Sequence, residues 1–178
     1  MNPNQTSQEI LPTEGRHAVH LFYRVSRSLW DLLDKPARLA AKTALAELVQ
    51  EIRAVPGTQL LLFSMVTPKA DIGFMLLTPD LHLADGFSKR LSAILGPDIL
   101  EPVFSWLSMT ERSEYTTSEE EYAHTLETEE NLEAGSAAFD EKMQAFRTRM
   151  AKYLKDRLEP NLPDWPVVCF YPMSKRRS

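Results

Sequence analysis

The sequence predicts an α+β fold: a β-α-β-β-α-β unit, followed by a helical connector and the first strand of a second unit. Two observations lead to this prediction. Segments between residues 16 and 112 switch between the apolar alternation of strands and the wider apolar spacing of helices, in the order of that unit. Pro56-Gly57 and Gly96-Pro97 end the two predicted helices. This is the ferredoxin-like order, an antiparallel sheet with two helices on one face.

The first strand and the first helix are predicted over residues 16–26 and 30–55. The strand segment is rich in β-formers, and apolar residues such as Val19 and Leu21 alternate along it, which is typical of a strand with one well-buried face. In the helical segment leucines recur mostly three to seven residues apart. Pro36 suits the first turn of a helix, where its missing N–H costs no hydrogen bond.

The remaining four elements complete the unit. Residues 58–66 and 72–77 are predicted to form a hairpin around a turn at 68–71, residues 79–95 a second helix, and residues 99–112 a fourth strand. Two helices on one face leave the other face of the sheet uncovered. Because the strands are apolar on both sides, that face needs cover too, and a second such unit from the same or another chain is the natural cover.

Four regions are expected along the chain. Residues 1–15 are predicted to be a disordered tail, since they lack the charged and apolar regions of a secretory signal. The ferredoxin-like domain spans 16–112, and an acidic segment with a helical connector spans 113–163. Residues 164–178 are predicted to begin a second, truncated ferredoxin-like domain, with a strand over residues 167–171.

Composition argues against several classes of protein. The formal net charge of −5 argues against a general nucleic-acid binder, whose surface is usually basic. The single cysteine, Cys169, excludes a disulfide framework within the chain and a zinc site built on several thiolates. No apolar stretch approaches the roughly 20 residues that a membrane-spanning helix needs. We therefore expect a cytoplasmic protein with no nucleic-acid or membrane partner.

The histidines and the acidic run offer no clear metal site. For each histidine a surface or packing role is favoured over metal ligation. The four are His17, His20, His82 and His124. The glutamates between residues 119 and 130 lack the glycine and the regular oxygen spacing of a calcium loop, so a solvated helix or loop face is the favoured interpretation.

Arg157, Tyr171 and Lys175 form the most informative set of polar residues. Arg157 ends the connector helix fourteen residues before Tyr171, and Lys175 follows four residues after it. If a pocket lies on the Tyr171 face of the strand, a phenol at its wall with two nearby cations suits a ligand with several carboxylates and an apolar body. A surface cluster without function is the alternative that these residues leave open.

Four stretches of the chain carry a family resemblance. They are FYPMSKRR (170–177), MVTPKADIGFMLLTP (65–79), SWLSMTERSEY (105–115), and Arg157-Leu158 with the spacing of Pro160 and Pro163. Together they resemble coproheme decarboxylases, haem-pathway members of the chlorite-dismutase-like family. The resemblance covers residues 16–178 apart from the acidic segment, which is longer than usual for that family.

This resemblance implies two ferredoxin-like units that form a dimeric α+β barrel, in a chain that assembles as a homopentamer. It implies binding of iron coproporphyrin III and conversion of two propionates to vinyl groups with hydrogen peroxide, which gives haem b. By position, Tyr171 matches the tyrosine that attacks the propionate as a radical, Lys175 the lysine beside that propionate, and Arg157 an arginine that holds a propionate. The axial histidine of the iron is expected downstream of Ser178, so the 178-residue chain alone is expected to be inactive.

Two other readings remain open. The first is a chlorite dismutase or peroxidase-like haem protein, against which the Tyr171–Lys175 spacing argues. The second is a non-catalytic module that dimerises through the open face or edges of a ferredoxin-like sheet.

Overall fold

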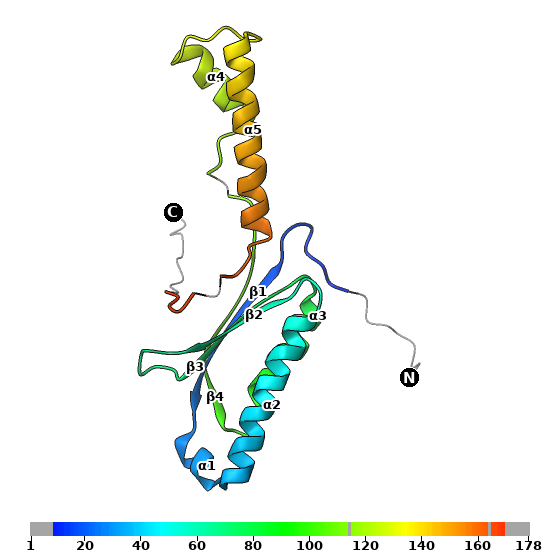
Figure 1. Ribbon diagram of the computed structural model, residues 1–178, viewed down its shortest axis with the longest axis vertical. Helices are drawn as coiled ribbons and strands as arrows, with labels where there is room; N and C mark the ends of the chain where they lie inside the picture. The colour runs from blue at the N-terminus through cyan, green and yellow to red at the C-terminus, as the bar shows by residue number, and fades with distance from the viewer. Residues whose placement is uncertain (1–8, 114, 164, 170–178) are drawn as a thin grey trace, which may run out of the picture.

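A computed structural model of the chain describes residues 9–113, 115–163 and 165–169 (Figure 1). Five helices and four strands occur in this part of the chain. They are β1 (His17–Val25), α1 (Arg27–Leu32), α2 (Lys35–Ala54), β2 (Gln59–Ser64), β3 (Ile72–Thr78), α3 (Leu81–Ala93), β4 (Leu100–Met109), α4 (Glu119–Thr128) and α5 (Ala137–Leu158).

The four strands form one sheet in the order β2-β3-β1-β4, and every neighbouring pair is antiparallel. Helices α2 and α3 lie together on one side of this sheet (Figure 1). The register opposes Val19 to Leu76 and Leu21 to Phe74, so the apolar residues of neighbouring strands share the face beneath the helices. The predicted ferredoxin-like α+β fold is confirmed.

The first helix differs from its prediction. The segment predicted as one helix over residues 30–55 forms two, because the chain is extended at Leu33 and Asp34. Asp34 is the N-cap of α2, and its carboxylate accepts a hydrogen bond of 2.8 Å from the backbone N–H of Ala37. Pro36 lies in the first turn of α2, as predicted.

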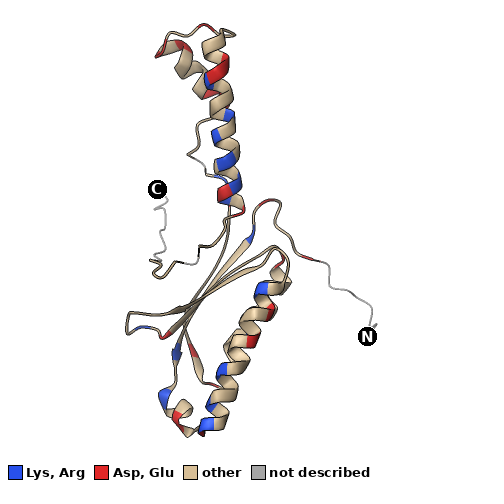
Figure 2. Ribbon diagram, in the orientation of Figure 1, with Lys and Arg blue, Asp and Glu red and all other residues tan. Residues whose placement is uncertain are grey.

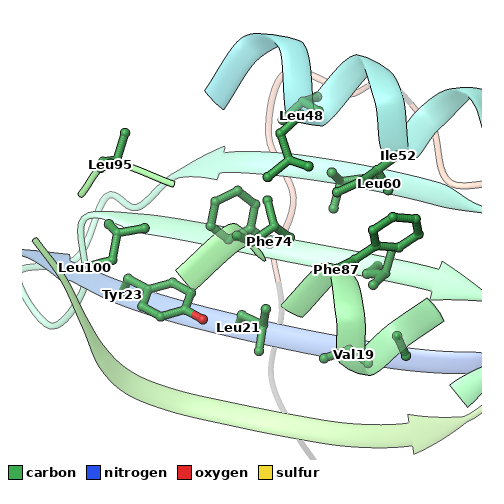
Figure 3. Packing of buried hydrophobic residues seen from close by; sticks show 14 of the residues in the cluster. Val19, Leu21, Tyr23, Leu48, Ile52, Leu60, Phe74, Phe87, Leu95 and Leu100 are labelled. Atoms are coloured by element: carbon green, nitrogen blue, oxygen red, sulfur yellow. The ribbon is translucent and has the colours of Figure 1, made fainter. Parts of the chain in front are cut away.

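The core lies between the sheet and the two helices (Figure 3). Phe74 and Leu76 of β3, Ile52 of α2 and Leu91 of α3 are each 0% exposed. Full burial of one such side chain stabilises a fold by about 1.5–3 kcal/mol. The helix-facing half of the sheet is therefore a well-formed apolar core.

The opposite face of the sheet is less covered. Phe22, Phe104 and Trp106 lie on this face, in register across β1 and β4. The Phe22 and Phe104 ring centroids are 6.1 Å apart, as are those of Phe104 and Trp106, and Trp106 is 41% exposed. We call this side the open face. Its apolar character agrees with the expectation that another element covers it.

The predicted disordered tail is wrong for its described part, while residues 1–8 lie outside the described residues. Ile10 donates its backbone N–H to the Asp80 carboxylate at 2.9 Å. The carbonyl of Ile10 accepts from the backbone N–H of Leu81 at 3.1 Å. Because Asp80 caps α3, the chain is bound at Ile10 to the start of that helix. Composition could not indicate this long-range backbone pairing.

The acidic segment folds into helix α4, which packs against α5 as a hairpin that stands away from the sheet (Figure 1). A capping box between Ser118 and Glu121 begins α4. The rings of Tyr122 and Phe146 stack with centroids 4.3 Å apart. None of the helices described in the structure is both long and apolar enough to cross a membrane.

Of the predicted strand over residues 167–171, the last two residues lie outside the described part of the chain. Residues 167–169 are described and have no strand pairing there. A strand forms only where a neighbouring edge supplies hydrogen-bond partners. This segment therefore remains a predicted strand of a second unit.

Candidate functional site

One of the three predicted site residues, Arg157, is in the described part of the chain, whereas Tyr171 and Lys175 lie outside it. Whether the three side chains converge thus remains a prediction. The structure does show how the end of α5 and the connector after it are fixed to the sheet. These contacts define the candidate site.

Arg157 lies in the last turn of α5, where its Nε donates a 2.7 Å hydrogen bond to the backbone carbonyl of Glu111. This bond orients the guanidinium through a main-chain acceptor. Because it uses Nε alone, the two terminal nitrogens retain the fork geometry that binds a carboxylate. The arginine also lies at a helix C-terminus, where a cation is favourable.

Thr110 ties the end of α5 to the sheet. Its hydroxyl donates to the carbonyl of Leu158 at 2.7 Å and accepts from the backbone N–H of Arg16 at 2.8 Å. The backbone N–H of Thr110 donates to the carbonyl of Arg16 at 2.9 Å. Gly15 approaches Thr110 so closely, at a φ of +77°, that a Cβ would lie 2.2 Å from its carbonyl oxygen. The start of β1, the end of β4 and the end of α5 therefore meet at one residue.

The side chain of Arg16 serves this same junction. One of its terminal nitrogens donates to the carbonyl of Gly57 at 2.9 Å, and the other lies 3.7 Å from the Glu159 carboxylate. The terminal nitrogens of Arg16 therefore interact with Gly57 and Glu159 of the protein itself. Arg157 uses its Nε for the Glu111 carbonyl, so its two terminal nitrogens can donate hydrogen bonds to the carboxylate of a ligand.

Gln59, the first residue of β2, holds the connector that follows α5. Its Nε2 donates to the carbonyl of Pro160 at 2.8 Å, and its Oε1 accepts from the backbone N–H of Leu162 at 2.8 Å. Gln59 is opposite Leu77 in the register and so belongs to the open face. The amide of Gln59 thus bonds a backbone carbonyl and a backbone N–H of the connector, as a paired strand would, and holds the connector beside the start of β2.

No motif in the sequence indicates the roles of Thr110 and Gln59. A threonine that ends a strand and a glutamine that begins one are ordinary, and their partners lie 48 to 103 residues away along the chain. The conspicuous prolines of the connector mark its position but not its attachment. Long-range hydrogen bonds of single side chains leave no local pattern.

Of the four histidines, His17 and His20 are buried and His82 and His124 are exposed. His20 is buried in β1, and this burial lowers its pKa below the usual 6.5. The Nε2 of His17 lies 3.2 Å from the carbonyl of Ile10. Among the described residues, no three His, Cys, Asp or Glu side chains gather in a way that could hold a metal ion.

A haem group does not fit the described residues by themselves. One shallow hollow lies between α3 and β4 and is lined by Ile10, Val19, His82 and Leu107 among others; a second lies beside β2 at Gln59 and Leu162. Arg157 lines neither of them. Arg157 is a cation on a fixed frame that can bind a carboxylate, and neither of the two hollows is an enclosed pocket for a porphyrin.

Known proteins similar to this chain include proteins named for haem binding and chlorite dismutases. The family model described as chlorite dismutase matches residues 38–178. A protein of Haloarcula marismortui named for haem binding is 28% identical over 167 residues, which is 92% of this chain and 22% of that protein. The chain thus spans about a fifth of the length of this relative.

Two solved structures show the likeness in fold. A haem-binding protein from Thermus thermophilus superposes with a TM-score of 0.58 at 24% identity, over 88% of this chain and 55% of that one. A chlorite dismutase mutant from Candidatus Nitrospira defluvii gives a TM-score of 0.52 at 16% identity, over 70% and 52% of the two chains. At these identities the structures support the fold and carry no residue roles across.

Proposed function

The chain belongs to the chlorite dismutase family, and from this premise we propose that it contributes to a haem-dependent enzyme that decarboxylates iron coproporphyrin III. In the proposed reaction two molecules of hydrogen peroxide oxidise two propionates to vinyl groups, two molecules of carbon dioxide leave, and haem b is the product. The names of two relatives both refer to haem binding, which supports the cofactor class. A homo-oligomer, a pentamer by family resemblance, and a cytoplasmic location belong to the same proposal.

The observation that supports this proposal best is the geometry of Arg157. A coproporphyrin has four carboxylate arms, and burial of a carboxylate is costly unless a cation pairs with it. Arg157 presents a guanidinium whose orientation is set by a main-chain carbonyl, on a helix end that Thr110 ties to the sheet. Such a preorganised fork is suited to a propionate.

Tyr171 and Lys175 have proposed roles that rest on the resemblance of residues 170–177. The phenol of Tyr171 relays one electron and one proton at the edge of the substrate, and the ammonium of Lys175 neutralises the reacting propionate. When bound, the iron porphyrin supplies oxidising power that no side chain has. The axial histidine is proposed to come from sequence beyond Ser178.

Binding measurements on the full-length protein test the Arg157 role. We expect Arg157→Gln to weaken binding of iron coproporphyrin III by roughly 10- to 100-fold, the effect of losing a charged hydrogen bond. Binding of haem b, which has two fewer carboxylates, should be less affected. Lys152→Gln, which removes another exposed cation of α5, is the matched control. Equal affinities of the wild type and Arg157→Gln for coproheme would remove the support that this residue gives.

A chlorite dismutase activity is the second candidate, because solved chlorite dismutases share this fold. Oxygen release from chlorite by the full-length protein, with coproheme left unchanged by peroxide, would favour it. The third candidate is a non-catalytic module, for which the apolar open face is the supporting observation. The 178-residue chain is expected to show no Soret shift typical of histidine ligation on titration with iron coproporphyrin. Failure of the full-length protein to bind any haem would favour the non-catalytic module.

A further inference from the structure

The two helices of the hairpin have unequal lengths. α4 has 10 residues and α5 has 22, which correspond to about 15 and 33 Å of helix. Glu119, the first residue of α4, pairs with Arg147 at 2.8 Å, and Glu130, just beyond its end, pairs with Lys142. α4 therefore lies along the first half of α5, and residues 148–158 extend past it toward the sheet. We call these residues the uncovered half of α5.

The uncovered half is basic and carries an exposed aromatic ring. Figure 2 shows Lys and Arg along the part of α5 nearest the sheet. Arg149, Lys152 and Lys155 are exposed, and Tyr153 is 39% exposed. The only acidic residue between 148 and 158 is Asp156, which pairs with Lys152 at 2.6 Å. This helix face therefore presents cations, their alkyl stems and a tyrosine to a partner.

The outward face of α4 has the opposite charge. Glu120, His124 and Glu127 are exposed and recur at positions i, i+4 and i+7, so they form one stripe. Between residues 119 and 133 the chain contains no Lys or Arg. Glu120 and Glu127 are about 10 Å apart along the helix axis, and Arg149 and Lys155 about 9 Å. The two pairs of charges are thus opposite in sign and similar in their spacing along the helix axis.

We propose that the uncovered half of α5 is the docking surface for helix α4 of a second copy of this chain. The fit in length supports this occupant, since residues 148–158 offer about the length of one α4. The charges support it as well, because the complementary surface is already present on the same polypeptide. The contact joins two different surfaces of the chain. Two copies can therefore each bind α4 of the other, or several copies can form a closed ring in which each binds α4 of the next. It does not depend on the proposed enzymatic activity.

Charge reversal in the 178-residue chain tests this contact. Glu120→Lys with Glu127→Lys makes α4 basic, and Arg149→Glu with Lys155→Glu makes the uncovered half acidic. Each double variant should weaken self-association by about tenfold or more, because like charges then face each other. An equimolar mixture of the two should associate again, since opposite charges meet once more. Sedimentation equilibrium measures the dissociation constants, and circular dichroism reports whether the helices are retained.

Two controls separate this contact from others. Glu9→Lys with Glu47→Lys makes the same change in net charge as the reversal in α4, at exposed positions outside the sheet and the hairpin, and should leave association unchanged. Association through the open face of the sheet persists in every variant, since none alters that face. The milder pair Glu120→Gln and Glu127→Gln serves if a reversal lowers helix content. A monomeric wild type, reversal variants that associate like the wild type, or a mixture that does not recover would each overturn the proposal.

Discussion

The ferredoxin-like domain and the α4–α5 hairpin are stabilised in different ways. In the domain, strands from distant parts of the sequence pair, and several large side chains are fully buried, Phe74 and Leu76 among them. In the hairpin, Leu126, Met143 and Phe146 are the buried residues, and the other described residues of the two helices are exposed or partly buried. The difference teaches that the domain has its own core, whereas the hairpin relies on a few local contacts and on its attachment at Thr110.

The largest expected effect lies in the core of the domain. Phe74→Ala should lower the free energy of unfolding by about 3–5 kcal/mol, because it empties a fully buried site between the sheet and both helices. Urea denaturation followed by circular dichroism measures this loss. A loss below 1 kcal/mol would show that the domain core is not the source of stability described above.

A smaller and local effect is expected in the hairpin. Phe146→Ala removes the ring that stacks on Tyr122 and supports the guanidinium of Arg149 at 5.6 Å. The cost should be near the lower end of about 3–5 kcal/mol and confined to α4 and α5. Amide hydrogen exchange should therefore accelerate in the hairpin and stay unchanged in β1 and β3. Equal acceleration in the sheet would mean that the two regions unfold as one unit.

A still smaller loss of stability is expected at the attachment between the two regions. Thr110→Val keeps the shape of the side chain but removes the hydroxyl that bonds the Leu158 carbonyl and the Arg16 N–H. A loss of about 1–3 kcal/mol is expected for groups left unsatisfied. Thr110→Ser retains the hydroxyl and is the matched control. Exchange of the amides at the end of α5 distinguishes the two variants; identical exchange would exclude Thr110 as the attachment point.

The smallest expected effect is on the pH dependence of the free energy of unfolding, through His20 of β1. Burial lowers the pKa of His20 in the folded chain below its usual 6.5. Protons therefore bind the unfolded chain more readily, and the stability that the neutral imidazole provides is lost as the pH falls below 6.5 toward the folded pKa. Unfolding measured between pH 7.5 and 5 should show this decline. His20→Gln should flatten it, and an unchanged slope in that variant would assign the decline to other groups.

Local patterns predicted the domain well and its attachments poorly. Apolar alternation and the Pro56-Gly57 and Gly96-Pro97 breaks indicated the element order, because strand and helix periods are set within a few residues. The bonds of Ile10 to the start of α3 and of Gln59 to the connector join distant residues, so no local pattern reports them. Of the candidate site, the sequence predicted a role for Arg157, which remains a prediction, and gave no sign of the Thr110 junction that fixes its helix.

The measurement that tests the proposed function most directly is the mass of the porphyrin after the full-length protein is mixed with iron coproporphyrin III and hydrogen peroxide. Stepwise loss of two carboxyl groups is predicted for the wild type, with the porphyrin left unchanged by Tyr171→Phe although that variant still binds it. A protein that binds coproheme but leaves all four carboxylates intact under peroxide would contradict the account.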